Sequence, residues 1–225
     1  MSESPRIVAL VPMRHESERV PGKNYRPFAG RPLYYHIVST LLECPTVSHV
    51  VIDTDSPLIR EDAGRSFPSV EVVERPEHLR AGTVPMTEVL RHDVDRISAD
   101  LYLQTHSTNP LLRASTIERA VAAFVFSADH HDALMSVTRI QARLWDGLGR
   151  AINHDPDVLL RTQDLSPVYL ENSCLYLFSR DTLLSTGRRS GRRPLLFEIP
   201  GSEAWDIDCE DDFVMGELIY RGLAR

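Results

Sequence analysis

A basic loop near the beginning of the sequence carries the residue types that bind phosphate. It follows the apolar run Ile7 to Val11, which predicts a buried strand, and it precedes a helical pattern that starts at Pro32. The loop contains four cations and two small polar residues: Arg14, Arg19, Lys23, Arg26, Ser17 and Asn24. In α/β proteins, backbone amides and cationic side chains beyond the carboxyl end of a strand bind phosphate groups. The sequence therefore predicts a phosphate-binding loop here.

Lys23 is the only lysine in the sequence, and the other strongly basic residues are all arginine. Lysine offers phosphate a compact, mobile point charge that arginine does not replace one for one. The loop contains neither the GxxxxGK[ST] pattern of a Walker A motif nor the GxGxxG pattern of a dinucleotide site. From residue types alone, we expect a phosphate-binding α/β enzyme of another kind.

A second chemical feature is the acidic segment around Asp206 and Asp208. Side chains two residues apart in an extended segment share a face, so both carboxylates can reach one cation while Ile207 turns into the core. A small number of hard oxygen ligands suits Mg²⁺. The alternative is an acidic helix start, which we favour for Glu210 to Asp212. A cationic loop and a carboxylate-held Mg²⁺ are complementary halves of a nucleoside-triphosphate site.

The elements that must position these residues alternate between strand and helix. Further strands are expected at 49–53, 70–73, 101–104 and 133–137, and helices at 32–43, 57–64, 87–97 and 115–126, with Ser56 and Ser115 as caps. This alternation predicts an α/β, Rossmann-like fold with a mostly parallel sheet and helices on both faces. Polar clusters follow four of the strands, at 14–24, 53–55, 75 and 104–109. Sites in such folds lie at these strand ends.

The alternation breaks down from Arg139 to Glu171. Turn signals at 155–157 and 166–167 indicate an excursion from the sheet, which we interpret as an arm that pairs with a second subunit. The pattern then returns with a strand at 172–178, a short helix at 182–187, a basic flexible loop to 194, a strand at 195–199 and a closing helix at 210–220. We therefore treat 1–225 as a single domain with 139–171 as its dimerisation excursion.

Composition narrows the class of function. The chain has 225 residues, 42% of them apolar, and a formal net charge of −7, which argues against general binding to nucleic acid or anionic membranes. We expect no membrane span and no signal peptide. The three cysteines are odd in number and widely spaced, which favours a cytoplasmic location with no disulfide framework or zinc site.

Several motifs together resemble a known family. The opening motif combines Val11-Pro12-Met13-Arg14 and Ser17 with the run from Arg19 to Asn24. Later matches, in chain order, are Asp53-Thr54-Asp55, Arg75-Pro76, Thr108 to Leu111, Arg161 to Tyr169, Asn172 and Asp206-Ile207-Asp208. This order is similar to that of the CMP-sugar-acid synthetases, the cytidylyltransferases that activate sialic acid, related nonulosonic acids and 3-deoxy-manno-octulosonate. The resemblance covers nearly the whole chain.

The resemblance implies a Rossmann-like sheet that binds CTP and a homodimer locked by the projecting arm. It implies attack of a sugar's anomeric hydroxyl on the α-phosphate of CTP, with release of pyrophosphate. Carried over by position, Arg14 and Lys23 would hold phosphates and act in catalysis with Asp208. Ser17, Asn24 and Arg75 would contact the nucleotide, Gln104, His106 and Asn172 would face the acceptor, and Asp206 and Asp208 would hold Mg²⁺.

The sequence also departs from the family pattern. Glu18 stands where a second basic residue is usual, and Gly82 lies where an aspartate often follows the arginine-proline pair. The usual asparagine-glycine-alanine is Asn172-Ser173-Cys174, and the family's LQPTSPLR can be matched through either Gln104 or His106. The acceptor could therefore be another nonulosonate or a smaller acid such as a phosphonate. A catalytically silent nucleotide-binding homologue is the alternative that Glu18 supports.

For some residues we also state the simpler structural expectation. Arg75 could instead form a surface ion pair with Glu74 or Glu77. His92, His130 and His131 are expected on solvated surfaces. The arginines of 188–193 could meet an acidic substrate, and otherwise form a solvated loop.

Overall fold

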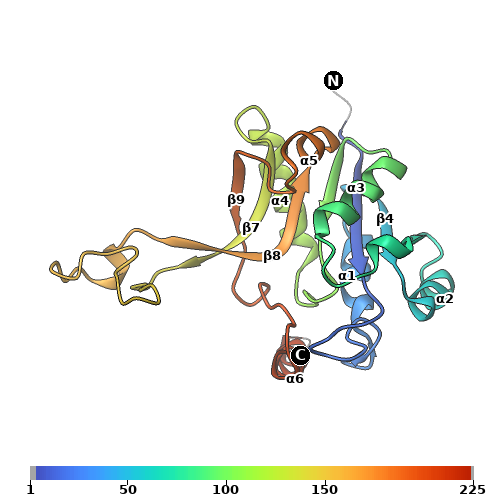
Figure 1. The fold of residues 1–225 in the computed structure, drawn as a ribbon, viewed down its shortest axis with the longest axis horizontal. Helices are drawn as coiled ribbons and strands as arrows, with labels where there is room; N and C mark the ends of the chain where they lie inside the picture. Colours follow the sequence, from blue (N-terminus) through green and yellow to red (C-terminus); the bar gives the residue numbers. More distant parts are fainter. Residues whose placement is uncertain (1–3, 224–225) are drawn as a thin grey trace.

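The core of the protein is a seven-stranded sheet in the order β5-β4-β1-β6-β8-β7-β9 (Figure 1). The computed structural model describes residues 4–223. The strands are β1 (Ile7–Met13), β4 (Val47–Thr54), β5 (Glu71–Glu74), β6 (Leu101–Gln104), β7 (Ala133–Ile140), β8 (Val168–Phe178) and β9 (Pro194–Glu198). A separate short ribbon pairs β2 (Pro27–Phe28) with β3 (Arg31–Pro32).

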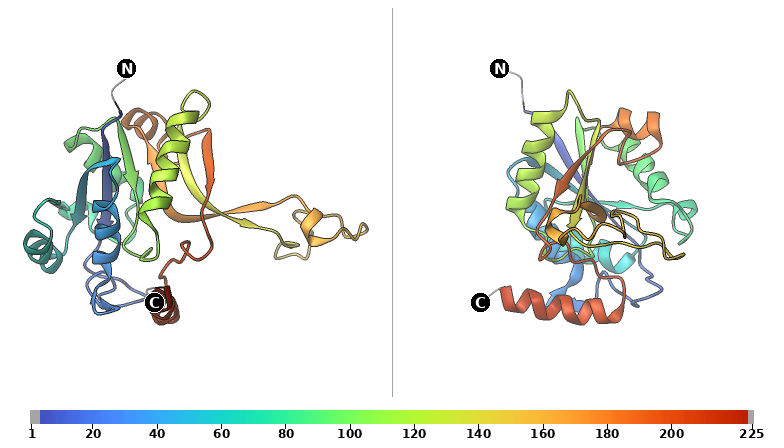
Figure 2. Two further views of the ribbon diagram at one scale, coloured as in Figure 1. Left: turned by 180° about the vertical axis from the view of Figure 1, so that it is seen from behind. Right: turned by 90° about the vertical axis from the view of Figure 1, so that its left-hand side faces the viewer.

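Helices cover both faces of this sheet (Figure 2). α1 (Leu33–Leu42), α2 (Pro57–Ser66) and α4 (Ala114–Ser127) cover one face, and α3 (Met86–Arg96) and α5 (Arg180–Thr186) cover the other. α6 (Glu210–Leu223) packs in a separate small cluster beyond the sheet, and single 3₁₀ turns lie at Glu77–Leu79 and Thr162–Asp164. Within residues 4–223, no helix has the length and apolar character needed to cross a membrane.

The central strand β1 is buried along its whole length because both of its faces are covered. Ile7, Ala9 and Val11 pack in the core that α1, α2 and α4 cover, whereas Val8 and Leu10 pack in the core beneath α3 and α5. Such a continuous apolar run is typical of a parallel strand between two helix layers. The predicted α/β, Rossmann-like class is confirmed.

One strand runs against the others. β8 pairs antiparallel with β6 and with β7, while the remaining pairs of the sheet are parallel. β7 and β8 continue together beyond the body of the protein and carry residues 141–167 on a long projecting arm (Figures 1 and 2). The expected excursion at 139–171 is therefore a projection, and its pairing with a second subunit stays a prediction.

Two predicted helix caps had different outcomes. Ser56 caps α2 as expected, because its hydroxyl accepts the Ile59 N–H and Pro57 occupies the first helical position. The expectation that Ser115 caps α4 was wrong, since the helix already begins at Ala114 and its N-cap residue is Arg113. The carboxylate of Glu203 accepts the Arg113 N–H at 3.0 Å. A residue distant in sequence therefore bonds the N–H of the N-cap residue itself, which is a different contact from the one expected of Ser115.

Ser173 lies in an irregularity where the register between β7 and β8 shifts around Ser136. Its φ of 56° falls in the left-handed region, which costs a residue with a Cβ about 1–2 kcal/mol. Glycine avoids this cost but adds roughly 0.5–1 kcal/mol of backbone entropy. We expect Ser173→Gly to raise the free energy of unfolding by up to about 1 kcal/mol in urea denaturation. The control Ser185→Gly, inside α5, should lower it, and equal losses in both variants would contradict the argument.

Candidate active site

A cavity of about 340 Å³ lies beyond the carboxyl ends of β1, β5 and β6. The loop after β1 and the segment that follows β5 contribute equal shares of its lining, and the rest comes from the end of β1 and the segment that follows β6. Six predicted site residues line it: Arg14, Ser17, Lys23, Asn24, Arg75 and His106. The sheet therefore brings together side chains that are as many as 92 positions apart, from Arg14 to His106.

The loop after β1 is held in a fixed path by its own hydrogen bonds. Asn24, which is buried, donates from Nδ2 to the Arg14 carbonyl at 2.7 Å and accepts the Ser107 hydroxyl at 2.6 Å. Gly22 has a φ of 65°, and a Cβ there would lie 2.8 Å from the Tyr25 ring. The turn before Lys23 therefore requires glycine, and Asn24 fastens the loop to the segment that follows β6.

Lys23 joins this loop to the predicted acidic segment. Its Nζ donates to the Ile207 carbonyl at 2.6 Å, between Asp206 and Asp208. Burial lowers the pKa of Lys23, and the two aspartates oppose that shift. Ile207 is fully buried, as the sequence predicted, in a small cluster with Val20 and Phe213. Lys23 thus joins the loop to the acidic segment, although neither aspartate is part of the cavity lining.

Other contacts fix the acidic segment beside the loop, where α6 and the loop lie side by side (Figures 1 and 2). Arg26 forms a bidentate pair with Glu210 at 2.6 and 2.7 Å, and Arg19 pairs with Asp208 at 2.6 Å. Asp212 accepts the backbone N–H groups of Asp208 and Cys209. Glu210 to Asp212 therefore form the acidic helix start that the sequence favoured.

The Asp206 and Asp208 pair has the chemistry of a site for a hard cation. Burial raises the pKa of Asp206. Its Oδ1 is buried and has no hydrogen-bond partner among the described residues. A buried carboxylate oxygen without a donor is costly unless a cation binds it. These residues therefore fit the predicted Mg²⁺.

Arg75 is buried rather than on the surface, and only 2% of it is exposed. Its Nε donates to the Asp53 carboxylate and its Nη2 to the Asp53 carbonyl. The alternative of a surface pair with Glu74 or Glu77 was wrong. β4 and β5 pair in parallel, so Asp53 near the end of β4 lies next to Arg75, the residue that follows β5. The guanidinium also lines the cavity, and its contact with a nucleotide stays a prediction.

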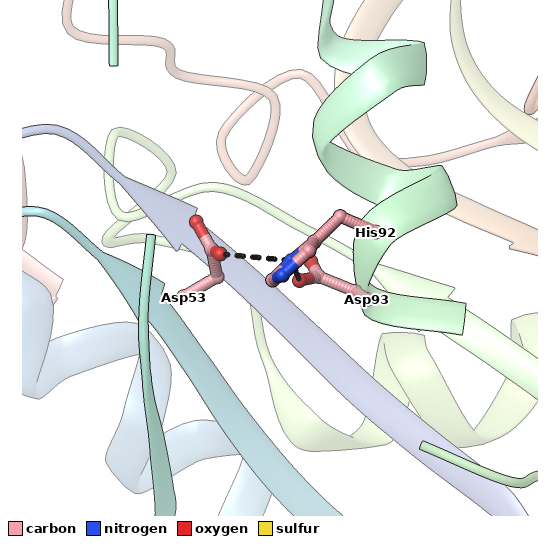
Figure 3. Close-up of side chains that lie close together, drawn as sticks. All are labelled: Asp53, His92 and Asp93. Carbon is pink, nitrogen blue, oxygen red and sulfur yellow. Dashed lines mark hydrogen bonds and ion pairs between the residues drawn. The ribbon is translucent and has the colours of Figure 1, made fainter. Parts of the chain in front are cut away.

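Asp53 belongs to a second cluster with His92 and Asp93, which converge from β4 and α3 (Figure 3). His92 Nδ1 lies 3.4 Å from Asp93 Oδ1 and 4.0 Å from Asp53 Oδ2. Burial raises the pKa of both aspartates and lowers that of His92. The expectation that His92 lies on a solvated surface was wrong, since its ring faces these carboxylates.

A third group, the Arg189 cluster, consists of Gln104, His106, Tyr176 and Arg189. Arg189 donates from Nη1 to Gln104 Oε1 at 2.6 Å and from Nη2 to the Tyr176 hydroxyl at 3.0 Å, and it stacks 3.7 Å from the Tyr176 ring centroid. Burial, with the cations Arg189 and Lys23 nearby, lowers the pKa of His106 to about 3. The sequence analysis placed Arg189 in a basic loop and did not predict its contacts with Gln104 and Tyr176. The only sign of them in the sequence was the run of arginines at 188–193, which could meet an acidic substrate.

Four predicted site residues are absent from the cavity lining: Asp206, Asp208, Gln104 and Asn172. Asn172 lies on β8. Its Oδ1 accepts the Ser136 hydroxyl at 2.6 Å and its Nδ2 donates to Thr138 at 3.1 Å, so its amide is bonded to β7. Gln104 is also absent from the cavity lining, but it contacts His106, which is part of that lining. Contacts of these residues with an acceptor stay predictions.

Comparison with known proteins identifies the family of the chain. The family model described as Cytidylyltransferase matches residues 8–189. The chain is 26% identical to an N-acylneuraminate cytidylyltransferase from Streptococcus agalactiae serotype III (strain NEM316), over 95% of this chain and 53% of that protein. It therefore spans about half the length of that relative.

Two further comparisons cover whole chains. A CMP-N,N'-diacetyllegionaminic acid synthase from Legionella pneumophila subsp. pneumophila (strain Philadelphia 1) is 28% identical over 95% of this chain and 96% of its own. A solved CMP:2-keto-3-deoxy-manno-octonic acid synthetase, in complex with CTP, has the same fold with a TM-score of 0.73 at 15% identity, covering 97% of this chain and 99% of that one. On the family match, which extends over most of its length, the chain belongs to the cytidylyltransferase family.

Proposed function

We propose that this protein transfers CMP from CTP to a small acidic acceptor, most simply a nonulosonic or similar sugar acid, and releases pyrophosphate. The observation that carries the proposal is the position of Lys23, which lines the cavity with Arg14 and Asn24 and also contacts the Asp206–Asp208 segment. Lys23 thus links the cations that line the cavity to the two carboxylates next to it, and a nucleoside triphosphate requires both kinds of group.

In the proposed reaction, Arg14 and Lys23 bind the phosphates and stabilise the negative charge that develops as the acceptor oxygen attacks the α-phosphorus. Ser17 and Asn24 contact the nucleotide, and Arg75 forms part of its binding surface. Asp206 and Asp208 would hold Mg²⁺, which when bound supplies Lewis-acid stabilisation of the phosphate oxygens. The attacking hydroxyl releases its proton to solvent as the new oxygen–phosphorus bond forms, the bond between the α-phosphorus and the bridging oxygen breaks, and pyrophosphate leaves.

The acceptor's acid group has a natural partner in the Arg189 cluster. A guanidinium presents paired N–H donors that match a carboxylate or a phosphonate. Arg189 is held against Gln104 and Tyr176, next to the cavity residue His106. Because the pKa of His106 is lowered to about 3, its ring is neutral at physiological pH and can bind a sugar hydroxyl without adding charge. We propose that Gln104, His106 and Arg189 contact the acceptor.

The experiment is a pyrophosphate-release assay with CTP, Mg²⁺ and a panel of nonulosonic acids, 3-deoxy-manno-octulosonate and phosphonates. Turnover with a sugar acid supports the main proposal, and turnover with phosphonates alone shifts the substrate class. Tight CTP binding without turnover on any acceptor favours the alternative that Glu18 supports, a catalytically silent nucleotide-binding homologue. For the productive acceptor, Arg189→Ala should raise its KM about tenfold or more while the KM for CTP changes little.

Gly82 offers a test of the nucleotide half of the site. A Cβ at this position would lie 2.6 Å from Arg14 Nη1 and 3.1 Å from Glu18 Oε1. We expect Gly82→Ala to displace the Arg14 guanidinium and to raise the KM for CTP about tenfold, since small misplacements of binding groups are costly. The control is Gly201→Ala, where a Cβ meets nothing within 4 Å. An unchanged KM in both variants would show that the Arg14 guanidinium can move aside from the new Cβ without loss of CTP binding, which would contradict the expected effect of Gly82→Ala.

We further propose that the arm packs against a second copy to form a homodimer. The arm exposes large apolar side chains, including Leu148 at 79% and Leu159 at 89%. Apolar surface of this kind on an extended projection is typical of an interface. Light scattering should give the mass of a dimer for the native chain and of a monomer for Leu148→Asp/Leu159→Asp. Phe126→Asp, equally exposed at the end of α4, should remain a dimer.

A further inference from the structure

The cluster of Asp53, His92 and Asp93 is outside the cavity lining and is connected to it through Arg75. One possible ligand atom from each residue lies within 4.8 Å of the other two (Figure 3). Arg75 is the element shared with the cavity, because it lines the cavity and also donates to Asp53. The proposed CMP transfer assigns no role to His92 or Asp93.

Carboxylate oxygens in this cluster lack the donors that burial requires. Asp53 is 1% exposed and Asp93 is 0% exposed, and the Oδ2 atom of each is buried without a hydrogen-bond partner among the described residues. Arg75 donates to Oδ1 of Asp53, so it leaves Oδ2 unpartnered. Buried acceptors in this condition are costly, and a cation that binds them removes the cost.

The donor set identifies the class of cation. One imidazole nitrogen with two carboxylate oxygens suits a first-row transition-metal dication, whereas Mg²⁺ and Ca²⁺ prefer oxygen ligands alone. Tetrahedral Zn²⁺ with bonds of about 2.0–2.1 Å places its ligand atoms about 3.4 Å apart. The 4.0 Å from His92 Nδ1 to Asp53 Oδ2 lies close to that value, as does the 3.4 Å from Nδ1 to Asp93 Oδ1, a pair that is hydrogen-bonded without a metal. His92 is 21% exposed, which leaves the cation a route in from solvent.

The surroundings also match those of a metal site. Ligating carboxylates are usually held by a further hydrogen bond, and Arg75 supplies that bond to Asp53. Asp53 follows a buried run of β4, and His92 and Asp93 lie on the regular helix α3, so the ligands come from rigid elements.

We propose that Asp53, His92 and Asp93 bind one Zn²⁺ ion, at a site separate from Asp206 and Asp208. Zn²⁺ at Asp53 Oδ2 fixes the carboxylate whose other oxygen holds Arg75, and so it fixes one wall of the cavity. The role is structural, and the proposal stands whether or not the protein transfers CMP.

The test is calorimetric titration of chelator-treated protein with Zn²⁺, using His92→Ala and Asp93→Asn. The native chain should bind about one equivalent, and each variant should bind it about 100-fold more weakly. His49→Ala is the matched control, because His49 lies 2.9 Å from Glu71 in an exposed pair, and Asp208→Asn excludes the other carboxylate site. Both of these should keep the tight equivalent. In the native chain, saturating Zn²⁺ should also raise Tm by roughly 5–10 °C.

Three outcomes would overturn the proposal. The first is that the native chain binds no Zn²⁺ tightly. The second is that one tightly bound Zn²⁺ remains in both His92→Ala and Asp93→Asn, and the third is that it is lost in Asp208→Asn instead. A proton shared by the two aspartates is the competing explanation, and it predicts that Asp93→Asn is stabilised without metal while the native chain binds none. If Asp93→Asn fails to fold by circular dichroism, His92→Ala, whose side chain is partly exposed, still decides the question.

Discussion

Lys23→Ala is expected to lower kcat for CMP transfer about 10³-fold while Tm falls by roughly 2–4 °C. The loss of activity follows from the position of Nζ at the cavity, where it can stabilise charge on the transferred phosphate. The loss of stability stays small because the side chain makes one hydrogen bond, to the Ile207 carbonyl, worth about 1 kcal/mol. Steady-state pyrophosphate release and thermal unfolding measure the two effects.

Arg26→Ala is the matched control for Lys23→Ala, because Arg26 is a cation of the same loop that is paired with Glu210 outside the cavity lining. It should keep most of the activity. Asp208→Asn should lose activity as Lys23→Ala does, since it removes one proposed Mg²⁺ ligand. If Lys23→Ala lost no more activity than Arg26→Ala, or if it unfolded the protein, Lys23 would be a structural residue.

Arg75→Ala is expected to destabilise the protein by about 3–5 kcal/mol, because it leaves the buried Asp53 carboxylate without its cation. For a domain of this size the loss lowers Tm by roughly 6–20 °C. The sign with pH follows from Asp53. In the native chain Arg75 favours its ionised form, so in the variant the pKa of Asp53 rises further. The difference in unfolding free energy between the native chain and Arg75→Ala should then be smaller at acidic pH. There the Asp53 carboxyl is protonated in both the folded and the unfolded state of the variant, so no buried charge is left unpaired.

Arg60→Ala provides the comparison, since Arg60 forms a more exposed pair with Glu74 on a neighbouring part of the surface. Exposed pairs contribute about 0–1 kcal/mol. Urea denaturation of both variants should therefore separate them clearly. Equal midpoints would show that the Arg75–Asp53 pair contributes no more than a surface contact.

The sheet could be predicted from the sequence because its strands are apolar runs that end at polar residues. Leu101 to Gln104 has the predicted bounds, and the first strand extends two residues beyond Val11. The convergence of Arg14, Asn24 and His106 followed from the rule that parallel strands end at the same edge. The direction of β8 was beyond this reasoning, since an apolar run has the same composition in either orientation.

The partners of the site residues were harder to predict. For Arg75 the acidic residues nearest in sequence are Glu74 and Glu77, yet strand pairing brings Asp53 to it. A signal for Asp93 was present, because it falls on the helical stripe with Val89, Leu90 and Val94 and so had to be buried. Arg189 depends on how its loop folds back over β6 and β8, which no local pattern encodes.

Because Lys23 is the only lysine of the chain, its Nζ is the only side-chain amine available for covalent labelling. Burial lowers its pKa, so the reactive neutral amine forms at lower pH than on an ordinary surface lysine. An amine-directed phosphate reagent such as pyridoxal phosphate, followed by borohydride reduction, can therefore mark this cavity without any substitution. Protection of that label by CTP would report occupancy of the nucleotide site directly.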